Sequence, residues 1–134
     1  MSRPIRYQSE ERSVFFVTDR CIHSRFLLRP SQRVHALIVG VLARALERFD
    51  VKLFGMCSLS NHYHLLLSSK DAATLASFMQ YVGSNIAREV GRQHRWRGER
   101  LWAPGTAYPA ILPTGLLRIA RGCFGPRSAG FQGR

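Results

Sequence analysis

The sequence has little lysine, few acidic residues, few cysteines and no long apolar segment. Lys52 and Lys70 are its two lysines. Its three cysteines are scattered and odd in number, which excludes a disulfide framework or a cysteine-based zinc site. No segment reaches the roughly 18 apolar residues of a membrane span, and residues 1–12 lack the apolar core of a secretory signal. We therefore expect a cytoplasmic protein with reduced thiols and no membrane attachment.

What the sequence does contain is arginine. Twenty basic residues stand against eight acidic ones, for a formal charge of +12, and all but the two lysines are arginine. The planar guanidinium forks onto phosphate oxygens, so this excess indicates a nucleic-acid partner. A length of 134 residues with 46% hydrophobic residues suits one domain with its own core.

The apolar periodicity predicts alternating strands and helices. Strands are expected at 13–18, at 51–59 and 62–67 as a hairpin, and at 107–112, with a possible short strand at 26–28. Helices are expected from Ser31 to Phe49 and, with Asp71 as N-cap, from Ala72 to about Gln93. This order predicts an α+β fold, a ferredoxin-like split βαβ sandwich with two main helices on one face of an antiparallel sheet. Residues 1–112 would form the domain and residues 113–134 a basic, poorly ordered tail.

The most distinctive motif is His62-Tyr63-His64, which follows the turn at Ser60-Asn61. Alternate side chains of a strand share a face, so the two imidazoles project together, about 7 Å apart, while Tyr63 points the other way. Two imidazoles placed in this way can converge on a divalent metal, but a third ligand must come from elsewhere.

Residues 61–67 (NHYHLLL) resemble the His-hydrophobic-His motif of the single-tyrosine transposases, the HUH endonucleases of small insertion sequences and REP-associated tyrosine transposases. The segments 17–20, 55–59, 78–80 and 97–102 also fit this family, and the resemblance covers about residues 14–112. It implies a dimeric enzyme that holds Mg²⁺ or Mn²⁺ through the histidine pair and a polar residue of the long helix. Such enzymes cut single-stranded or hairpin DNA through a phosphotyrosine.

The resemblance leaves the nucleophile open. The family register places its tyrosine at or near Ile86, which cannot act as a nucleophile and continues the apolar stripe of the helix. The nearest phenol is Tyr81, and Asn85 follows it one helical turn later on the same polar face. We therefore expect Tyr81 as the catalytic residue and Asn85 as the third metal ligand, beside His62 and His64. A helix tyrosine that only packs locally is an equally good interpretation of Tyr81.

A basic and aromatic cluster predicts the DNA-binding surface. Arginine contacts phosphates and tryptophan stacks on unpaired bases, a combination typical of single-strand recognition. The predicted DNA-binding residues are Arg20, Arg88, Arg92, Arg95, Trp96, Arg97, Arg100 and Trp102.

Two hypotheses follow. The first is a metal-dependent DNA transposase, monomeric or homodimeric, that cleaves and rejoins single-stranded or hairpin DNA. The alternative is a catalytically degenerate DNA-binding relative, suggested by Ile86 and by a tail that departs from the family pattern. An RNA-binding domain of the same βαββαβ order is a weaker possibility, because the sequence lacks the aromatic signature of that class.

Overall fold

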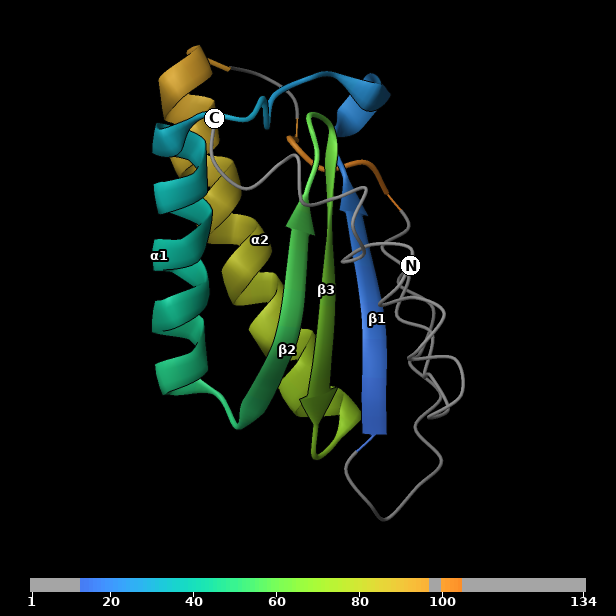
Figure 1. The fold of residues 1–134 in the computed structure, drawn as a ribbon. Coiled ribbons are helices and arrows are strands. Elements are labelled where there is room, and N and C mark those ends of the chain that lie inside the picture. Colours follow the sequence, from blue (N-terminus) through green and yellow to red (C-terminus); the bar gives the residue numbers. More distant parts are fainter. Residues whose placement is uncertain (1–12, 97–99, 105–134) are drawn as a thin grey trace, which may run out of the picture.

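The computed structural model describes residues 13–96 and 100–104 (Figure 1). The elements in chain order are β1 (Ser13–Arg20), the 3₁₀ turn η1 (Ile22–Ser24), α1 (Gln32–Arg48), β2 (Val51–Ser58), β3 (His62–Ser69) and α2 (Ala72–His94). Both predicted helices and the strands predicted at 13–18, 51–59 and 62–67 are confirmed, with β1 and β3 each extending two residues further. The strand predicted at 107–112, and the tail beyond it, lie outside the described residues.

The three strands form one antiparallel sheet in the order β1-β3-β2, which places β3 in the centre. Across β1 and β3, Thr18 pairs with His64 and Arg20 pairs with His62. On the other side of β3, Cys57 of β2 also pairs with His64. This order is the one expected of a split βαβ fold, in which the strands joined through α1 flank the third strand. The predicted α+β class is therefore confirmed.

Side-chain caps begin both helices. The hydroxyl of Ser31 accepts a hydrogen bond from the backbone N–H of Val34 at 3.1 Å, at the start of α1. The carboxylate of Asp71 accepts one from the backbone N–H of Thr74 at 2.6 Å, at the start of α2. The hydrogen bonds from Thr74 favour the charged form of Asp71 and lower its pKa. Both caps satisfy N–H groups that the first turn of a helix leaves without partners.

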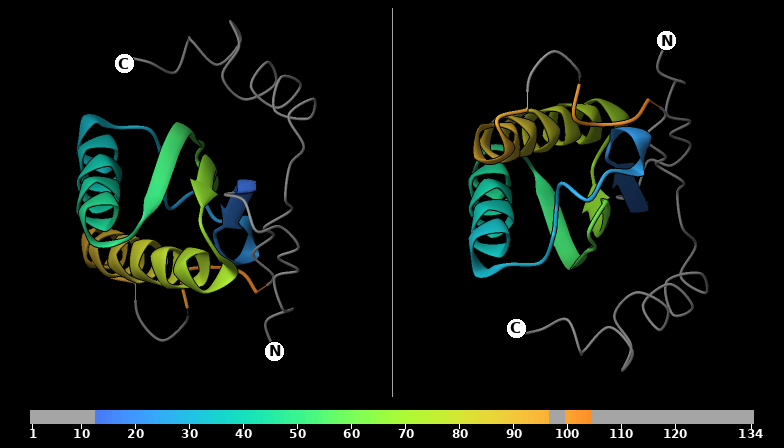
Figure 2. Two further views of the ribbon diagram at one scale, coloured as in Figure 1. Left: turned by 90° about the horizontal axis from the view of Figure 1, so that it is seen from below. Right: turned by 90° about the horizontal axis from the view of Figure 1, so that it is seen from above.

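The core lies between the sheet and the two helices, which cover the same side of it (Figure 2). From β3 it receives Tyr63, Leu65 and Leu67, each at most 1% exposed. From α2 it receives the predicted apolar stripe, including Ile86, which is fully buried. Within the described ranges, neither helix is both long and apolar enough to cross a membrane.

The short strand predicted at residues 26–28 is wrong. This segment follows η1 as a turn whose two leucines are buried while Phe26 is 58% exposed. The backbone N–H of Leu28 donates to the carbonyl of Ser60 at 2.9 Å, a single contact with the β2–β3 turn. The two leucines close one end of the core. A run of three apolar residues in a sequence does not by itself distinguish a buried turn from a strand.

Candidate metal and DNA site

The two histidines of β3 lie side by side, as predicted. Their ring centroids are 4.8 Å apart, with the rings at 81° to each other, and both side chains are partly buried. The strand alternates regularly here, because Tyr63 between them points into the core under the helices. His62 and His64 therefore belong to the opposite face of the sheet, which neither described helix covers.

Each imidazole is held through its Nδ1 atom. His62 Nδ1 lies 2.7 Å from the side-chain oxygen of Asn61, and the amide nitrogen of Asn61 donates to the carbonyl of Ser24. That second bond orients the Asn61 oxygen toward His62, so Nδ1 carries the proton and donates. His64 Nδ1 lies 2.8 Å from the hydroxyl of Thr18. In the tautomer with the proton on Nδ1, each ring presents Nε2 as a metal ligand, which is the arrangement found around ligating histidines.

The electrostatic surroundings favour neutral imidazoles. Burial lowers the pKa of His62, and the positive charge of Arg20 adds to the effect. Burial also lowers the pKa of His64, with smaller contributions from His62 and Arg20. Both shifts favour the neutral imidazole, which is the form that binds metals.

The neighbours on this face offer few further metal ligands. Phe16 stacks on His64 with ring centroids 4.9 Å apart, which fixes the ring from one side. Cys57 pairs with His64 across the strands, but burial raises the pKa of its thiol and keeps it protonated. In the described part of the chain, no third His, Cys, Asp or Glu joins the pair to make a metal cluster.

The structure does not bring Tyr81 and Asn85 to the histidines. Tyr81 packs edge-on against Phe49, with ring centroids 5.8 Å apart, and Arg48 lies over its ring at 5.1 Å. The amide of Asn85 donates to the backbone carbonyl of Tyr81 at 2.8 Å. Both residues belong to α2, which packs on the other face of the sheet, so local packing accounts for them. The sheet itself separates the predicted nucleophile and third ligand from the histidine pair.

Tyr63 anchors the histidine strand from beneath. Its hydroxyl donates to the carboxylate of Asp19 at 3.0 Å, and both side chains are buried. The ring of Trp102 meets Tyr63 edge-on at 5.4 Å, and its indole N–H donates to the carbonyl of Gly83 in α2 at 2.8 Å. The chain of contacts from α2 through Trp102 to Tyr63 fixes the middle of β3. The sequence-based expectation that Tyr63 points away from the histidines is confirmed.

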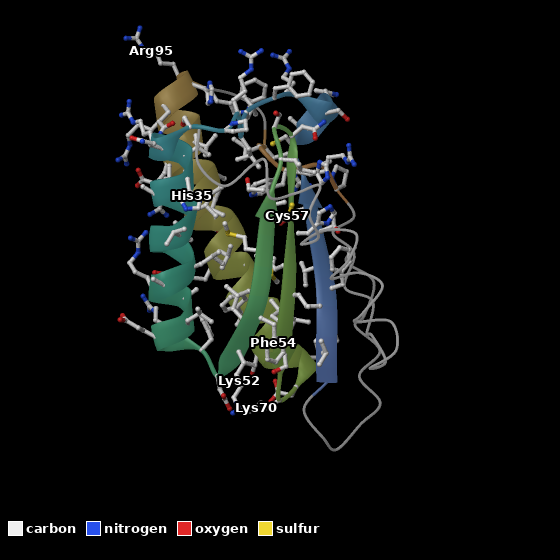
Figure 3. All side chains as sticks on the ribbon, viewed as in Figure 1. His35, Lys52, Phe54, Cys57, Lys70 and Arg95 are labelled. Atoms are coloured by element: carbon white, nitrogen blue, oxygen red, sulfur yellow. The ribbon has the colours of Figure 1, made fainter. Side chains whose placement is uncertain are left out.

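The predicted DNA-binding arginines divide between two surfaces. Arg20 is exposed at the end of β1, next to the histidines. The others belong to the helix side, and Figure 3 shows Arg95 projecting from the end of α2. They line a shallow groove of about 560 Å³ formed with the segment after α2. Its lining arginines are Arg88, Arg92, Arg95 and Arg100. Arg97 lies outside the described residues.

Both predicted DNA-binding tryptophans pack against the core, and Trp96 also lines the arginine groove at the end of α2. Trp102 donates a hydrogen bond to Gly83 and packs edge-on against Tyr63, as described above, and its backbone forms an isolated β-bridge with Cys21. Trp96 packs against the core, and the guanidinium of Arg25 lies 5.0 Å from its ring centroid. The presence of arginine and tryptophan in a segment does not show whether the tryptophan ring is exposed or packs against the core at the end of a helix.

Sequence reasoning missed the residues that orient the imidazoles. The sequence places Asn61 in a turn and in the family motif without giving it a role, although its adjacency to His62 is a usable signal. Thr18 lies 46 positions from His64 in the sequence. Only the register of β1 against β3 brings it to the ring, and a single sequence does not contain that register.

Comparison with known proteins identifies the family of this chain and solved structures of similar fold. The family model of transposases described as IS200-like matches residues 21–108. The fold resembles that of a REP-associated tyrosine transposase solved with a REP hairpin, with a TM-score of 0.64 at 16% identity over 89% of this chain and 67% of that chain. It also resembles a candidate transposase of Deinococcus radiodurans R1, with a TM-score of 0.60 at 14% identity over 91% of this chain and 95% of that one. No curated protein matches the sequence. The family match covers more than half of the chain and includes the histidine hairpin, so the chain belongs to the IS200-like transposases.

Proposed function

We propose that this protein is a DNA transposase that cleaves and rejoins single-stranded or hairpin DNA at the face carrying His62 and His64. The observation that carries the proposal is the orientation of the two rings, whose Nδ1 atoms are both engaged, so that the tautomer with the proton on Nδ1 presents Nε2 to a ligand. The family membership and the likeness to a transposase bound to a REP hairpin support DNA as the partner.

The donor set fits a divalent metal. Two neutral imidazoles suit Mn²⁺ better than Mg²⁺, which prefers oxygen ligands. His62 and His64 would hold the ion through Nε2, with further ligands from the DNA, water or another part of the protein. When bound, such an ion stabilises the negative charge that develops on a phosphate undergoing displacement.

The residues of the chain then do the following. Arg20, exposed beside the histidines, would bind a phosphate of the incoming strand and orient it. A tyrosine oxygen would form a bond to phosphorus while the bond between phosphorus and the 3′ oxygen breaks, and the phenolic proton would pass to that leaving oxygen. The resulting phosphotyrosine conserves the energy of the broken phosphodiester bond, so rejoining needs no nucleotide cofactor.

The tyrosine can be identified by experiment. The protein is incubated with Mn²⁺ and a labelled oligonucleotide, and a covalent adduct that resists SDS is the expected product. The four tyrosines are changed to phenylalanine one at a time: Tyr7, Tyr63, Tyr81 and Tyr108. Tyr63 and Tyr81 lie on the helix side of the sheet, so we expect the adduct to survive both changes and to be lost in Tyr7→Phe or Tyr108→Phe. Loss of the adduct in Tyr81→Phe would show instead that a second copy of the chain supplies the phenol.

A second candidate function is DNA binding without cleavage. It is favoured by one observation, that the two tyrosines in the described residues both lie away from the histidine face. Under this alternative no adduct forms with any substrate, yet salt-sensitive binding of DNA remains. Loss of Mn²⁺ binding in His62→Ala and His64→Ala would still be expected, because the metal ligands are present in either case.

A further inference from the structure

The loop between β1 and α1 lies at the end of the molecule where α2 ends and where β2 turns into β3 (Figure 1). At its start, the backbone N–H of Cys21 donates to the carbonyl of Asn61 at 2.7 Å. In its middle, the carbonyl of Ser24 accepts from the side-chain amide of Asn61 at 3.3 Å. Further on, the backbone N–H of Leu28 donates into the same turn, as described above. Asn61, which engages Nδ1 of His62, is therefore held by this loop through both its backbone and its side chain.

The middle of the loop has a strained backbone. His23 and Ser24 both have a φ of 53°, in the left-handed region, and neither residue is a glycine. Residues in this conformation cost free energy and persist only where the surrounding contacts impose it. The position of the Ser24 carbonyl opposite Asn61 therefore depends on contacts that come from outside the loop.

The C-terminal end of α2 supplies such contacts. His94 Nε2 lies 3.0 Å from the carbonyl of Leu27, and because a carbonyl only accepts, Nε2 carries the proton and donates. The guanidinium of Arg25 lies 5.0 Å from the ring centroid of Trp96, in a cation–π contact. Trp96 is itself fixed, since its backbone N–H donates to the carbonyl of Gly91 at 2.8 Å and its side chain packs against the core. The end of α2 thus holds the part of the loop that directly follows the strained residues.

We propose that this loop positions His62 and that His94 and Trp96 hold the loop in place. The contacts run from the end of α2 to the loop, from the loop to Asn61, and from Asn61 to Nδ1 of His62. Two residues of the helix side would therefore act on a residue of the opposite face of the sheet. The proposal rests on the proposed function only in taking His62 as a metal ligand.

His64 provides an internal reference for this proposal. Its Nδ1 atom lies 2.8 Å from the hydroxyl of Thr18, which belongs to β1 and pairs with His64 within the sheet. No residue of the loop takes part in that contact, so a change in the loop should affect His62 and leave His64 as it is. A general loss of stability would affect both rings alike.

NMR of the isotope-labelled imidazoles in metal-free protein, at a pH above the histidine pKa, reads the tautomer of each ring. The variants His62→Ala and His64→Ala assign the signals. A neutral imidazole without a partner at Nδ1 favours the proton on Nε2. His94→Ala should therefore shift His62 toward that tautomer and leave His64 unchanged. His94→Gln keeps an N–H donor near the position of Nε2 and should restore the wild-type state of His62.

Calorimetric titration with Mn²⁺ tests the consequence for the metal. Asn61→Ala removes the direct partner of His62 and should lower the affinity by about 10- to 100-fold. Trp96→Leu keeps an apolar side chain against the core but removes the ring beneath Arg25, and it should lower the affinity by about threefold or more. Arg25→Gln removes the same contact from the exposed side, so the test stands even if Trp96→Leu does not fold. The control His35→Ala removes an exposed histidine of α1 (Figure 3) and should change neither tautomer nor affinity.

The outcomes separate the positioning loop from the proposed function. Unchanged tautomers in His94→Ala, together with a lower stability in urea, would overturn the proposal, because the contacts would then only close the end of the core. Equal shifts of His62 and His64 would also overturn it. A shift confined to His62 in His94→Ala, in a protein that binds no Mn²⁺, would keep the positioning loop and refute the metal site.

Discussion

Replacing Thr18 by valine tests whether the orientation of His64 matters for metal binding. Valine has the same shape and a similar preference for a strand, so the change removes the hydroxyl that lies 2.8 Å from His64 Nδ1 and little else. Loss of the hydrogen-bond partner of a ligating histidine typically lowers metal affinity by about 10- to 100-fold, or about 1.4 to 2.7 kcal/mol. We expect a loss in this range for Thr18→Val.

Isothermal titration calorimetry measures the Mn²⁺ affinity directly. The assay is run at pH 7.5, about one unit above the ordinary histidine pKa. His64→Ala gives the loss expected when the ligand itself is removed. Thr74→Val is the matched control, because it makes the same chemical change at the start of α2, away from the histidines. Unfolding in urea shows whether either valine variant alters global stability. Wild-type Mn²⁺ affinity in Thr18→Val would refute the idea that the hydroxyl holds His64 for a metal.

Three further predictions follow from the geometry. Burial and the charge of Arg20 lower the pKa of His62 and His64 below the ordinary 6.5, so Mn²⁺ affinity should stay constant as the pH falls to that value and decline only below it. Arg20→Gln should raise both pKa values and move this decline to higher pH. An unchanged pH profile in Arg20→Gln would contradict the assigned cause. Tyr63→Phe removes a buried hydrogen bond to a carboxylate and should lower the free energy of unfolding by about 1.5 to 3 kcal/mol in urea titrations, so a neutral result would show that the bond is not stabilising. Gly83→Ala adds a methyl group whose nearest neighbour, the Trp102 indole, lies at 3.5 Å, so the change should stabilise α2 by about 0.5 to 1 kcal/mol. A lower melting temperature would mean that the contact between α2 and Trp102 leaves no room for the methyl group.

The sequence predicted those parts of the molecule that local rules determine. Period-two alternation placed His62 and His64 on one face, and the helical stripe placed Ile86 in the core, as the structure has them. Tyr81 and Asn85 lie beside that stripe, where Tyr81 is partly buried against the core and the amide of Asn85 donates to its backbone carbonyl. In one copy of the chain they lie across the sheet from the histidines, because a helix can pack on either face of a sheet and the spacing of polar residues along it does not say which.

The arginines illustrate the same limit for surfaces. Residue type alone grouped Arg20 with the helix arginines, whereas the sheet lies between them. Arg33 and Arg44 of α1 lie near Arg92 only because α1 packs against α2. Contacts between distant segments depend on packing, which one sequence does not specify.

The alternation of β3 makes the site and the fold depend on one register. A slip of one residue in the β2–β3 turn would turn the histidines into the core and carry Tyr63 out to the opposite face. It would leave Asp19 buried beneath the helices without its phenol. Small insertions or deletions at this turn should therefore be lost as folding failures before they can produce a folded protein with a displaced metal site. Substitutions of the histidines meet no such barrier, so a lineage of this fold can lose its chemistry easily while it keeps its shape.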